Sequence, residues 1–289
     1  MDDWLPDRPT LRPGLRVTRR DDHHLQVGFD PAQRVVLPER PAVRNLLADL
    51  AVGRRPDLGE PDVRRWARAL ADSDLLVDAA DVARQLAGPL PRPAVQAAFA
   101  QHGAEAAARL EARGAARVAL DADEPWRSAV LRLLTATGLP AAPPRAIPTA
   151  RLLVAAGGEP VRDDVDRHVR ADVPHLLVRN VRARATVGPF VVPGTTACLR
   201  CLDAHASDAD PGHAVLVEQH APVGDEPCDP LLMQLALAWA VRDLVTYVEG
   251  GLPSTWSATV ECGPDLTLVR REWPRHLRCG CSWGDALVG

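Results

Sequence analysis

Two short cysteine pairs near the end of the chain constrain its fold more than any other feature. Cys198 and Cys201 form a Cys-x-x-Cys pair, and Cys279 and Cys281 form a Cys-x-Cys pair. Four thiolates from two such turns can surround one zinc ion as a tetrahedron, with Zn–S distances of about 2.3 Å. Gly280 allows the second turn to be tight enough for both sulfurs to face one ion. The pairs therefore predict a structural zinc site that fixes the C-terminal segment to the body of the chain.

Two other interpretations of these cysteines stay open at this point. The pairs can be free thiols without a metal, or Cys198 and Cys201 can form a redox pair. A redox Cys-x-x-Cys normally opens a helix directly after a strand, whereas Pro193-Gly194 and two threonines precede this one. Trp273 and Trp283 lie on either side of the second pair, and we expect both to pack around the metal.

Charge and the N-terminus limit the partners and the location that we expect. The formal charge is −4, whereas a nucleic-acid-binding protein needs a basic face, so nucleic acid is not an expected partner. Every basic residue is arginine, which excludes chemistry that requires a lysine. The N-terminus lacks the features of a signal peptide, and we find no run of 18 apolar residues that would span a membrane. We therefore expect a cytoplasmic protein with no membrane partner, in which clustered cysteines bind metal.

Hydrophobic periodicity predicts a small first domain over residues 1–88. Within residues 14–37, apolar and polar side chains alternate in three short runs, the second of which contains Leu25, Val27 and Phe29. Two helices are expected to follow, one beginning near Pro41 and the other near Pro61. This order is typical of a winged-helix-like module. The proline-rich stretch that follows, from Gly88 to Pro93, is typical of a stiff linker.

The second expected domain, residues 94–289, alternates strands and helices. It opens with an alanine-rich helix at residues 94–113. Strands are expected at 117–120, 150–155 and 175–178, with helices near 126–137 and 163–170 between them. Such an alternation predicts a parallel, doubly wound sheet of the Rossmann type. A long apolar helix from Met233 to Val248 and two further strands then lead to the second cysteine pair.

The run from Val187 to Cys201 (VGPFVVPGTTACLRC), Asp210-Pro211 and the stretch from His276 to Trp283 resemble the ThiF-like proteins of peptide natural-product clusters. These are cyclodehydratase or leader-peptide-binding components of thiazole/oxazole-modified microcin biosynthesis. Their parent family is the ubiquitin-activating-enzyme-like adenylyltransferases. The resemblance covers residues 90–289 and extends by pattern alone to residues 11–78. It implies an α/β, Rossmann-like ThiF-type domain with a zinc knuckle, preceded by a small winged-helix-like peptide-recognition module.

The expected nucleotide site departs from that of the parent family. Adenylating members carry a glycine-rich turn after the first strand, because the backbone must approach the phosphates of ATP. Here residues 121–126 are Asp-Ala-Asp-Glu-Pro-Trp, and three carboxylates would repel a triphosphate. Gly157-Gly158-Glu159-Pro160 stands where the family places its metal-binding Asp, and the family's catalytic Cys is not evident. We therefore expect neither ATP nor catalytic residues, although Asp121 and Asp123 are of a type that binds magnesium.

The resemblance implies an adaptor that captures the leader of a ribosomal precursor peptide and presents it to a YcaO-type cyclodehydratase; its relatives also dimerise. In the expected mode, an extended leader adds as a strand beside residues 33–37 and packs against the helix at residues 61–72. Arginines of that helix would pair with an acidic leader. The expected contact residues are Gln33, Arg34, Val35, Val36, Leu37, Val63, Arg64, Trp66 and Arg68. Two alternatives stay open, an active ATP-dependent adenylyltransferase of the ThiF type and a structural scaffold that binds no peptide.

Overall fold

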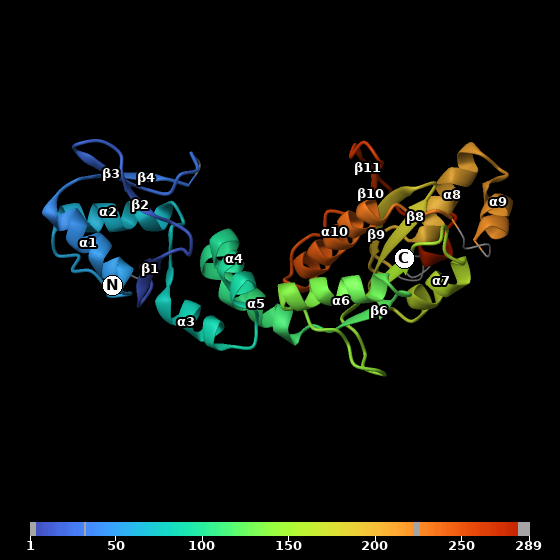
Figure 1. The fold of residues 1–289 in the computed structure, drawn as a ribbon, viewed down its shortest axis with the longest axis horizontal. Coiled ribbons are helices and arrows are strands. Elements are labelled where there is room, and N and C mark those ends of the chain that lie inside the picture. Colours follow the sequence, from blue (N-terminus) through green and yellow to red (C-terminus); the bar gives the residue numbers. More distant parts are fainter. Residues whose placement is uncertain (1–3, 32, 222–225, 283–289) are drawn as a thin grey trace, which may run out of the picture. The chain divides into compact units, whose positions relative to one another are not determined.

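The computed structural model describes residues 4–31, 33–221 and 226–282, and the chain divides into two compact units. The first unit comprises Met1–Ala112 and the second Arg113–Gly289; Figure 1 shows their helices and strands. The helices between residues 92 and 112 therefore belong to the first unit. The sequence suggests a different boundary, between residues 88 and 94. That boundary between two functional modules stays a prediction.

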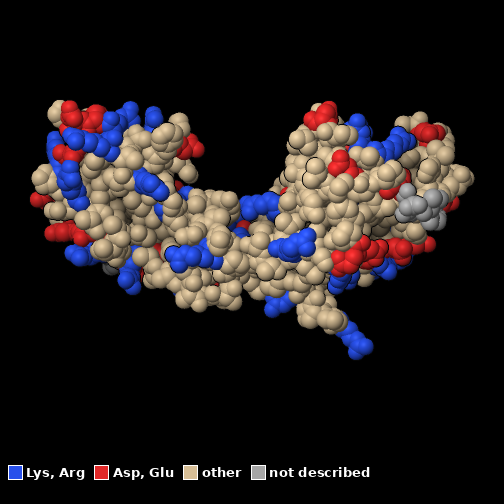
Figure 2. Space-filling view, viewed as in Figure 1, with Lys and Arg blue, Asp and Glu red and all other residues tan. Residues whose placement is uncertain are grey.

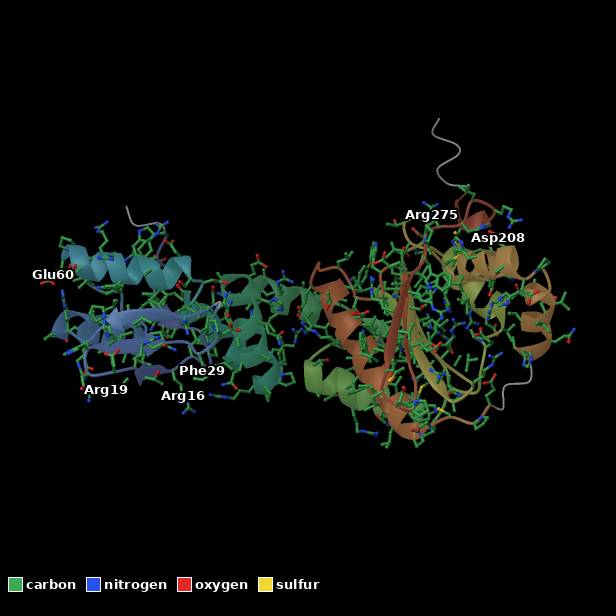
Figure 3. The ribbon with its side chains drawn as sticks, turned by 90° about the horizontal axis from the view of Figure 1, so that it is seen from above. Arg16, Arg19, Phe29, Glu60, Asp208 and Arg275 are labelled. Carbon is green, nitrogen blue, oxygen red and sulfur yellow. The ribbon has the colours of Figure 1, made fainter. Side chains whose placement is uncertain are left out.

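The first unit contains a three-stranded antiparallel sheet in the order β2-β3-β4. Its strands are β2 (Val17–Arg19), β3 (His24–Val27) and β4 (Val35–Pro38). Leu25 and Val27 face the core as expected, but Phe29 does not continue the strand and its side chain is 93% exposed (Figure 3). The reason is Gly28, whose φ of +82° ends β3; a Cβ there would lie 2.2 Å from the carbonyl oxygen of Gln33.

Helices and a second, smaller sheet complete the first unit. Both α1 and α2 begin with a proline in the first turn, where its missing N–H costs no hydrogen bond. Val43, Leu46 and Leu50 of α1 pack against Val63 and Leu70 of α2 in one apolar core. The elements are α1 (Pro41–Ala51), α2 (Pro61–Asp72), α3 (Ala79–Ala87), and the antiparallel pair β1 (Pro9–Leu11) and β5 (Leu76–Asp78).

The helix expected at residues 94–113 is interrupted, which corrects the prediction from sequence. The structure has α4 (Arg92–His102), the short 3-10 helix η1 (Gly103–Glu105) and α5 (Ala106–Ala115). Gly103 has a φ of +52°, and a Cβ at this position would lie 2.0 Å from Nη2 of Arg12. The buried Arg12 guanidinium, which pairs with Asp74, therefore fills the space beside Gly103. A contact between residues this far apart in sequence is invisible to local periodicity.

The second unit is built on a six-stranded mixed sheet in the order β11-β10-β9-β8-β7-β6. Only β6, β7 and β8 run parallel, so the expectation of a parallel sheet is wrong for the other three strands. A tight turn at Arg182 and Ala183, both with φ near +55°, joins β8 to β9 as a hairpin. The strands are β6 (Val118–Asp121), β7 (Ala150–Ala155), β8 (His175–Val181), β9 (Arg184–Val191), β10 (Ala258–Cys262) and β11 (Leu268–Glu272).

Helices cover both faces of this sheet. Leu152 and Leu176 pack toward α6 and α10 on one face, whereas Leu153 and Leu177 pack toward α7 and α8 on the other. The alternation of neighbouring residues between two faces follows from the period of two in a strand. The helices are α6 (Trp126–Thr137), α7 (Arg162–Arg170), α8 (Leu199–Ala209), α9 (His213–His220), α10 (Pro230–Val248) and the 3-10 helix η2 (Gly280–Ser282).

The chain reverses its direction of winding at β6. After α6, residues 140–142 lie along one side of β6: the Val118 N–H donates to the Pro140 carbonyl (3.0 Å), and the Ala142 N–H donates to the Val118 carbonyl (2.7 Å). The next strand, β7, pairs with the other side of β6. Such a reversal is a topological switch point, beyond which doubly wound proteins bind ligands at the carboxyl ends of their strands.

The sequence contains no unbroken run of 18 apolar residues, but the helix α10 is nevertheless long and apolar. By length and composition it is apolar enough to cross a membrane, and it is the one such helix among the described residues. Half of its apolar 18-residue stretch is buried inside the protein. Its buried residues, among them Met233, Leu237 and Val241, pack against the sheet and α6. The apolar character of α10 is therefore that of a core helix.

We expect the buried ion pair between Arg113 and Glu249 to contribute strongly to stability. Their side chains are 5% and 1% exposed, and Arg113 Nε donates to Glu249 at 2.6 Å. Glu249→Gln leaves the guanidinium charge unpaired and should cost about 3–5 kcal/mol in unfolding free energy, measured by urea denaturation. Glu105→Gln, which breaks an exposed ion pair with Arg109, is the matched control and should leave the urea midpoint nearly unchanged. Equal midpoints for the two variants would contradict the assignment.

Candidate functional site

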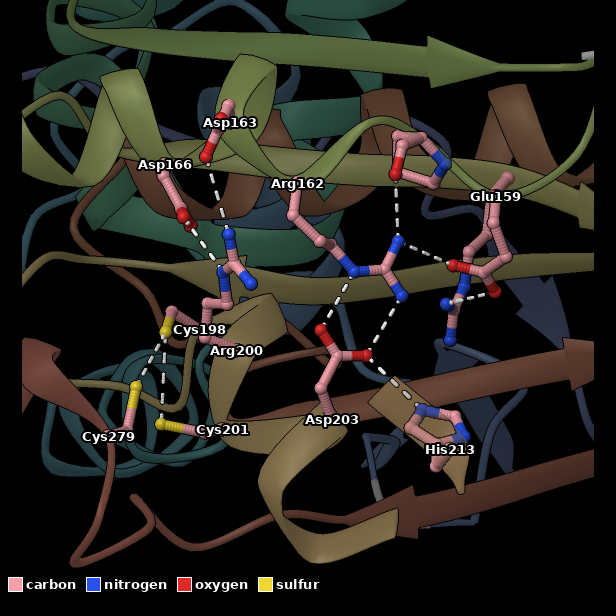
Figure 4. A network of polar contacts seen from close by, with 12 residues as sticks. Glu159, Arg162, Asp163, Asp166, Cys198, Arg200, Cys201, Asp203, His213 and Cys279 are labelled. Atoms are coloured by element: carbon pink, nitrogen blue, oxygen red, sulfur yellow. Dashed lines mark hydrogen bonds and ion pairs between the residues drawn. The ribbon is translucent and has the colours of Figure 1, made fainter. Parts of the chain in front are cut away.

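The four cysteines of the two pairs lie together, as the sequence predicts. Figure 4 shows three of them, Cys198, Cys201 and Cys279. The Sγ atom of Cys198 is 3.8 Å from that of Cys201 and 3.6 Å from that of Cys279, and the Sγ atoms of Cys201 and Cys281 are 3.4 Å apart. Thiolates at the corners of a tetrahedral metal site with 2.3 Å bonds are about 3.8 Å apart. The separations fit that geometry and far exceed a disulfide bond length of about 2.05 Å. The cysteines are free thiols that can hold one metal ion.

Local structure brings the sulfurs to one point. Cys198 precedes the first residue of α8 and Cys201 lies in its first turn, so both side chains point to the same end of the helix. Cys279 and Cys281 come from the turn at η2, where the Cys279 N–H donates to the His276 carbonyl at 2.9 Å. Apolar side chains from β7, β8, β9 and α8 surround the cluster.

Of the two tryptophans expected around the metal, Trp273 packs against this cluster. Its Nε1 also donates to Thr259 Oγ1 at 2.9 Å, which fixes the ring against β10. Trp283 lies outside the described residues. Trp273 therefore links the knuckle to the sheet.

Close packing of the thiols separates their pKa values. The hydrogen bond from Cys198 is the main cause that lowers the pKa of Cys201, and the same donor lowers that of Cys281 to about 6. Hydrogen bonding to Cys201 raises the pKa of Cys198 itself. Because thiolates are the form that binds metal, a cluster in which some thiols ionise this readily is suited to a soft cation.

A polar network ties the knuckle to α8. His276 Nε2 lies 2.9 Å from an Asp208 carboxylate oxygen, and the Arg278 N–H donates to His276 Nδ1 at 3.2 Å. Asp208 also pairs with the Arg278 guanidinium. His205, Asp208 and His276 lie close enough to be considered as metal ligands, but both ring nitrogens of His276 and the carboxylate already have protein partners. We therefore interpret this group as a tether that orients the metal-binding turn.

At the switch point between β6 and β7, two acidic side chains have partners within the protein. The Asp121 carboxylate at the end of β6 pairs with Arg167 at 2.8 Å. The Glu124 carboxylate accepts the Ser128 N–H at 3.3 Å in the first turn of α6. The remaining cavity is about 190 Å³, below the roughly 300–1,000 Å³ of ordinary ligand pockets. Acidic side chains gather over β6 and α7 on this side (Figure 2).

The stretch after β7 carries a second self-contained network, drawn in Figure 4. Arg162 donates to both Asp203 oxygens at 2.8 Å, and Glu159 accepts from Arg179 at 2.6 Å. Burial alone would lower the pKa of Arg162, but the hydrogen bond and charge of Asp203 raise it above its usual value. Both arginines of this network, Arg162 and Arg179, are therefore paired with carboxylates of the protein.

In the first unit, β4 is an edge strand of its sheet, so one side of its backbone has no partner strand in that sheet. The Glu39 N–H donates to the His23 carbonyl at 2.7 Å, in the same register that pairs Leu37 with Leu25. Because inward and outward bonding alternate along an antiparallel strand, Val36 directs its N–H and C=O away from β3. No other described segment forms a backbone bond with Val36.

The expected peptide-contact residues fall into separate groups. Val35 and Leu37 are buried, whereas Val36 is half-buried; Gln33 and Arg34 are exposed just before β4. On α2, Val63 faces the core. These positions make β4 and the residues before it an accessible edge whose inner side chains anchor the sheet.

The two flanks of α2 differ. Trp66 and Asp62, four residues apart, share one flank, where Asp62 pairs with Arg40 at 3.1 Å. Arg64 and Arg68 share the opposite flank. There Arg64 Nε donates to the Leu58 carbonyl at 3.3 Å and Arg68 pairs with Asp72 at 2.8 Å. The residues of α2 that are expected to contact the peptide therefore lie on two different flanks of the helix.

Comparisons with known proteins locate the chain by its fold. No protein-family model and no curated protein matches it. A heterocyclase solved with substrate and cofactor aligns with a TM-score of 0.70 at 16% identity, over 95% of this chain and 39% of its own. The heterocyclase TruD gives a TM-score of 0.70 at 16% identity, over 96% of this chain and 43% of its own. The chain therefore spans about two fifths of the heterocyclases that it matches.

A shorter protein matches along nearly its whole length. E. coli MccB aligns with a TM-score of 0.62 at 12% identity, over 95% of this chain and 96% of its own. Solved complexes of MccB contain MccA in one case and ATP in another. At these identities the likeness shows a shared fold, that of heterocyclases and MccB.

We expect the purified chain to carry about one metal ion, held by the four cysteines. Cys201→Ser should release most of it and lower the melting temperature, because metal binding contributes directly to folding. Elemental mass spectrometry and thermal unfolding measure the two effects. Cys262→Ser is the control, since this buried thiol contacts the Gly263 carbonyl and lies outside the cluster. Full metal content in Cys201→Ser combined with Cys279→Ser would contradict the site.

Proposed function

We propose that the chain is an adaptor that binds the leader of a ribosomal precursor peptide and presents it to a separate YcaO-type cyclodehydratase. The fold that it shares with heterocyclases and with MccB supports this proposal. MccB is a protein that has been solved with MccA, which favours a peptide partner for this fold. The four-cysteine centre, in this proposal, holds zinc in a structural role, because protein ligands fill all four positions.

The observation that carries the proposal is the open edge of β4 beside α2. An extended peptide that adds to a sheet edge gains main-chain hydrogen bonds, and pockets for alternate side chains add specificity. Val36 offers one N–H and one C=O for such bonds, and Trp66 offers an apolar surface on the adjacent flank of α2. The Arg65 guanidinium lies 4.9 Å from the centre of the Trp66 ring, where it would pair with an acidic residue of the leader.

A second candidate is an active adenylyltransferase, which the solved complex of MccB with ATP favours. We propose that this chain does not adenylate. Arg167 and the Ser128 N–H are the groups at the switch point that could contact phosphates. In this structure they bond to Asp121 and Glu124 instead.

Val36→Pro tests the adaptor proposal. It removes the outward N–H, and proline is tolerated in an edge strand where that N–H faces solvent. We expect the dissociation constant of the leader peptide encoded in the same gene cluster to rise about tenfold or more, since a backbone hydrogen bond is lost and its partner is left unpaired. Fluorescence anisotropy with labelled leader measures the constant.

Val36→Ala, which keeps the N–H, is the matched control and should bind within a few fold of the unaltered chain. Equal affinity of Val36→Pro and the unaltered protein, with both folded, would contradict strand addition at β4. Failure of the unaltered protein to bind at tens of micromolar would favour the structural scaffold.

A further inference from the structure

The three-stranded sheet of the first unit turns one side to the core and leaves the other side open. Leu25 and Val27 of β3 pack in the core. Thr18, Gln26 and Val36 lie opposite one another in the register of the three strands, so their side chains share the other side. Thr18 is exposed, and Gln26 and Val36 are half-buried. We call this side the outer face, and it is accessible to a partner.

Three arginines at the margins of the outer face form no ion pair with any residue that the structure describes. The Arg20 guanidinium donates to the neutral side chain of Gln26 at 2.6 Å, which places it on this face and leaves its charge uncompensated. Arg16 and Arg34 are exposed, one position before β2 and one before β4. The register of the sheet, extended by one step, sets these two arginines on either side of Gly28.

The spacing of Arg16 and Arg34 suits an anion. Neighbouring strands lie about 4.8 Å apart, so two residues with β3 between them have their backbones about 10 Å apart. A guanidinium binds a carboxylate through two parallel hydrogen bonds, and its charge persists at every physiological pH. Because about 10 Å is also the screening length at 0.1 M salt, the charges of both arginines act on an anion bound beside either one.

Two observations favour a peptide carboxylate over the phosphates of a nucleic acid. The basic area ends at the turn between β2 and β3, where Asp21 and Asp22 are exposed and Asp21 lies 2.8 Å from His24 Nδ1. A nucleic acid requires an extended basic surface. Arg34 also lies two residues before Val36, whose outward N–H and C=O form a donor and acceptor pair that a peptide backbone matches.

We propose that the outer face recognises acidic side chains of the leader peptide through Arg34 and Arg16, an inference that rests on the proposed function. A peptide strand that adds to β4 continues its alternation, so the residues opposite Arg34 and opposite Val36 both direct their side chains to the outer face. Cβ atoms directly opposite one another are about 5 Å apart, and opposite charges there stabilise the pair. The leader therefore carries Asp or Glu two positions from the residue that bonds to Val36.

Charge reversal tests this recognition. Arg34→Glu should raise the dissociation constant of the fluorescein-labelled leader encoded in the same gene cluster about tenfold, because like charges then face each other. Arg16→Glu, farther from β4, should have a smaller effect of the same sign. Both effects should shrink at about 0.5 M salt. Arg92→Glu is the matched control, since Arg92 is exposed in α4 outside this sheet and forms no ion pair among the described residues.

The outcomes separate this inference from the proposed function. Recovery of binding to Arg34→Glu when one acidic residue of the leader is replaced by lysine would support the pairing. If the unaltered chain binds leader and both variants bind it equally well, with melting temperatures showing that all are folded, the outer face is not the site. Single-stranded DNA binding that both variants lose, with leader binding unchanged, would assign the face to nucleic acid and overturn the proposal. No leader binding by the unaltered chain at tens of micromolar would overturn the proposed function itself.

Discussion

The second unit depends on four sulfurs that come from two places far apart in the chain. Cys198 and Cys279 are separated by 81 positions, yet their Sγ atoms lie 3.6 Å apart. Binding of a structural metal by four thiolates is worth about 10–16 kcal/mol in small zinc domains, as much as the whole stability of a typical domain. The centre joins the start of α8 to the C-terminal turn, and the Asp208 tether and Trp273 hold the same turn from other sides.

Local sequence patterns predicted the elements whose signals are local. The proline-opened helices α1 and α2, strand β7 and the metal-binding cysteines lie where periodicity and spacing placed them. Two features were missed, one because it depends on a distant contact and one because its turn residues are untypical. The break at Gly103 depends on the Arg12 side chain, and the hairpin from β8 to β9 turns at Arg182 and Ala183, which are not typical turn residues.

The candidate sites could be predicted only in part, because they also depend on contacts between residues far apart in the sequence. The acidic sequence after β6 indicated that a phosphate cradle was missing, but not that Arg167 would neutralise Asp121 or that residues 140–142 would form the switch point. The edge position of β4 follows from three short strands in succession. The ion pair that Asp62 of α2 forms with Arg40 is a contact that a linear pattern does not encode.

In the proposed function the chain holds a peptide without activating it, and the ion pairs of Asp121 with Arg167 and of Arg162 with Asp203, near the carboxyl ends of the parallel strands, support this proposal. ATP–pyrophosphate exchange with the metal-loaded chain, in the presence of precursor peptide and magnesium, tests this claim most directly. We expect exchange no faster than in the absence of protein. Robust exchange that depends on the peptide would contradict it.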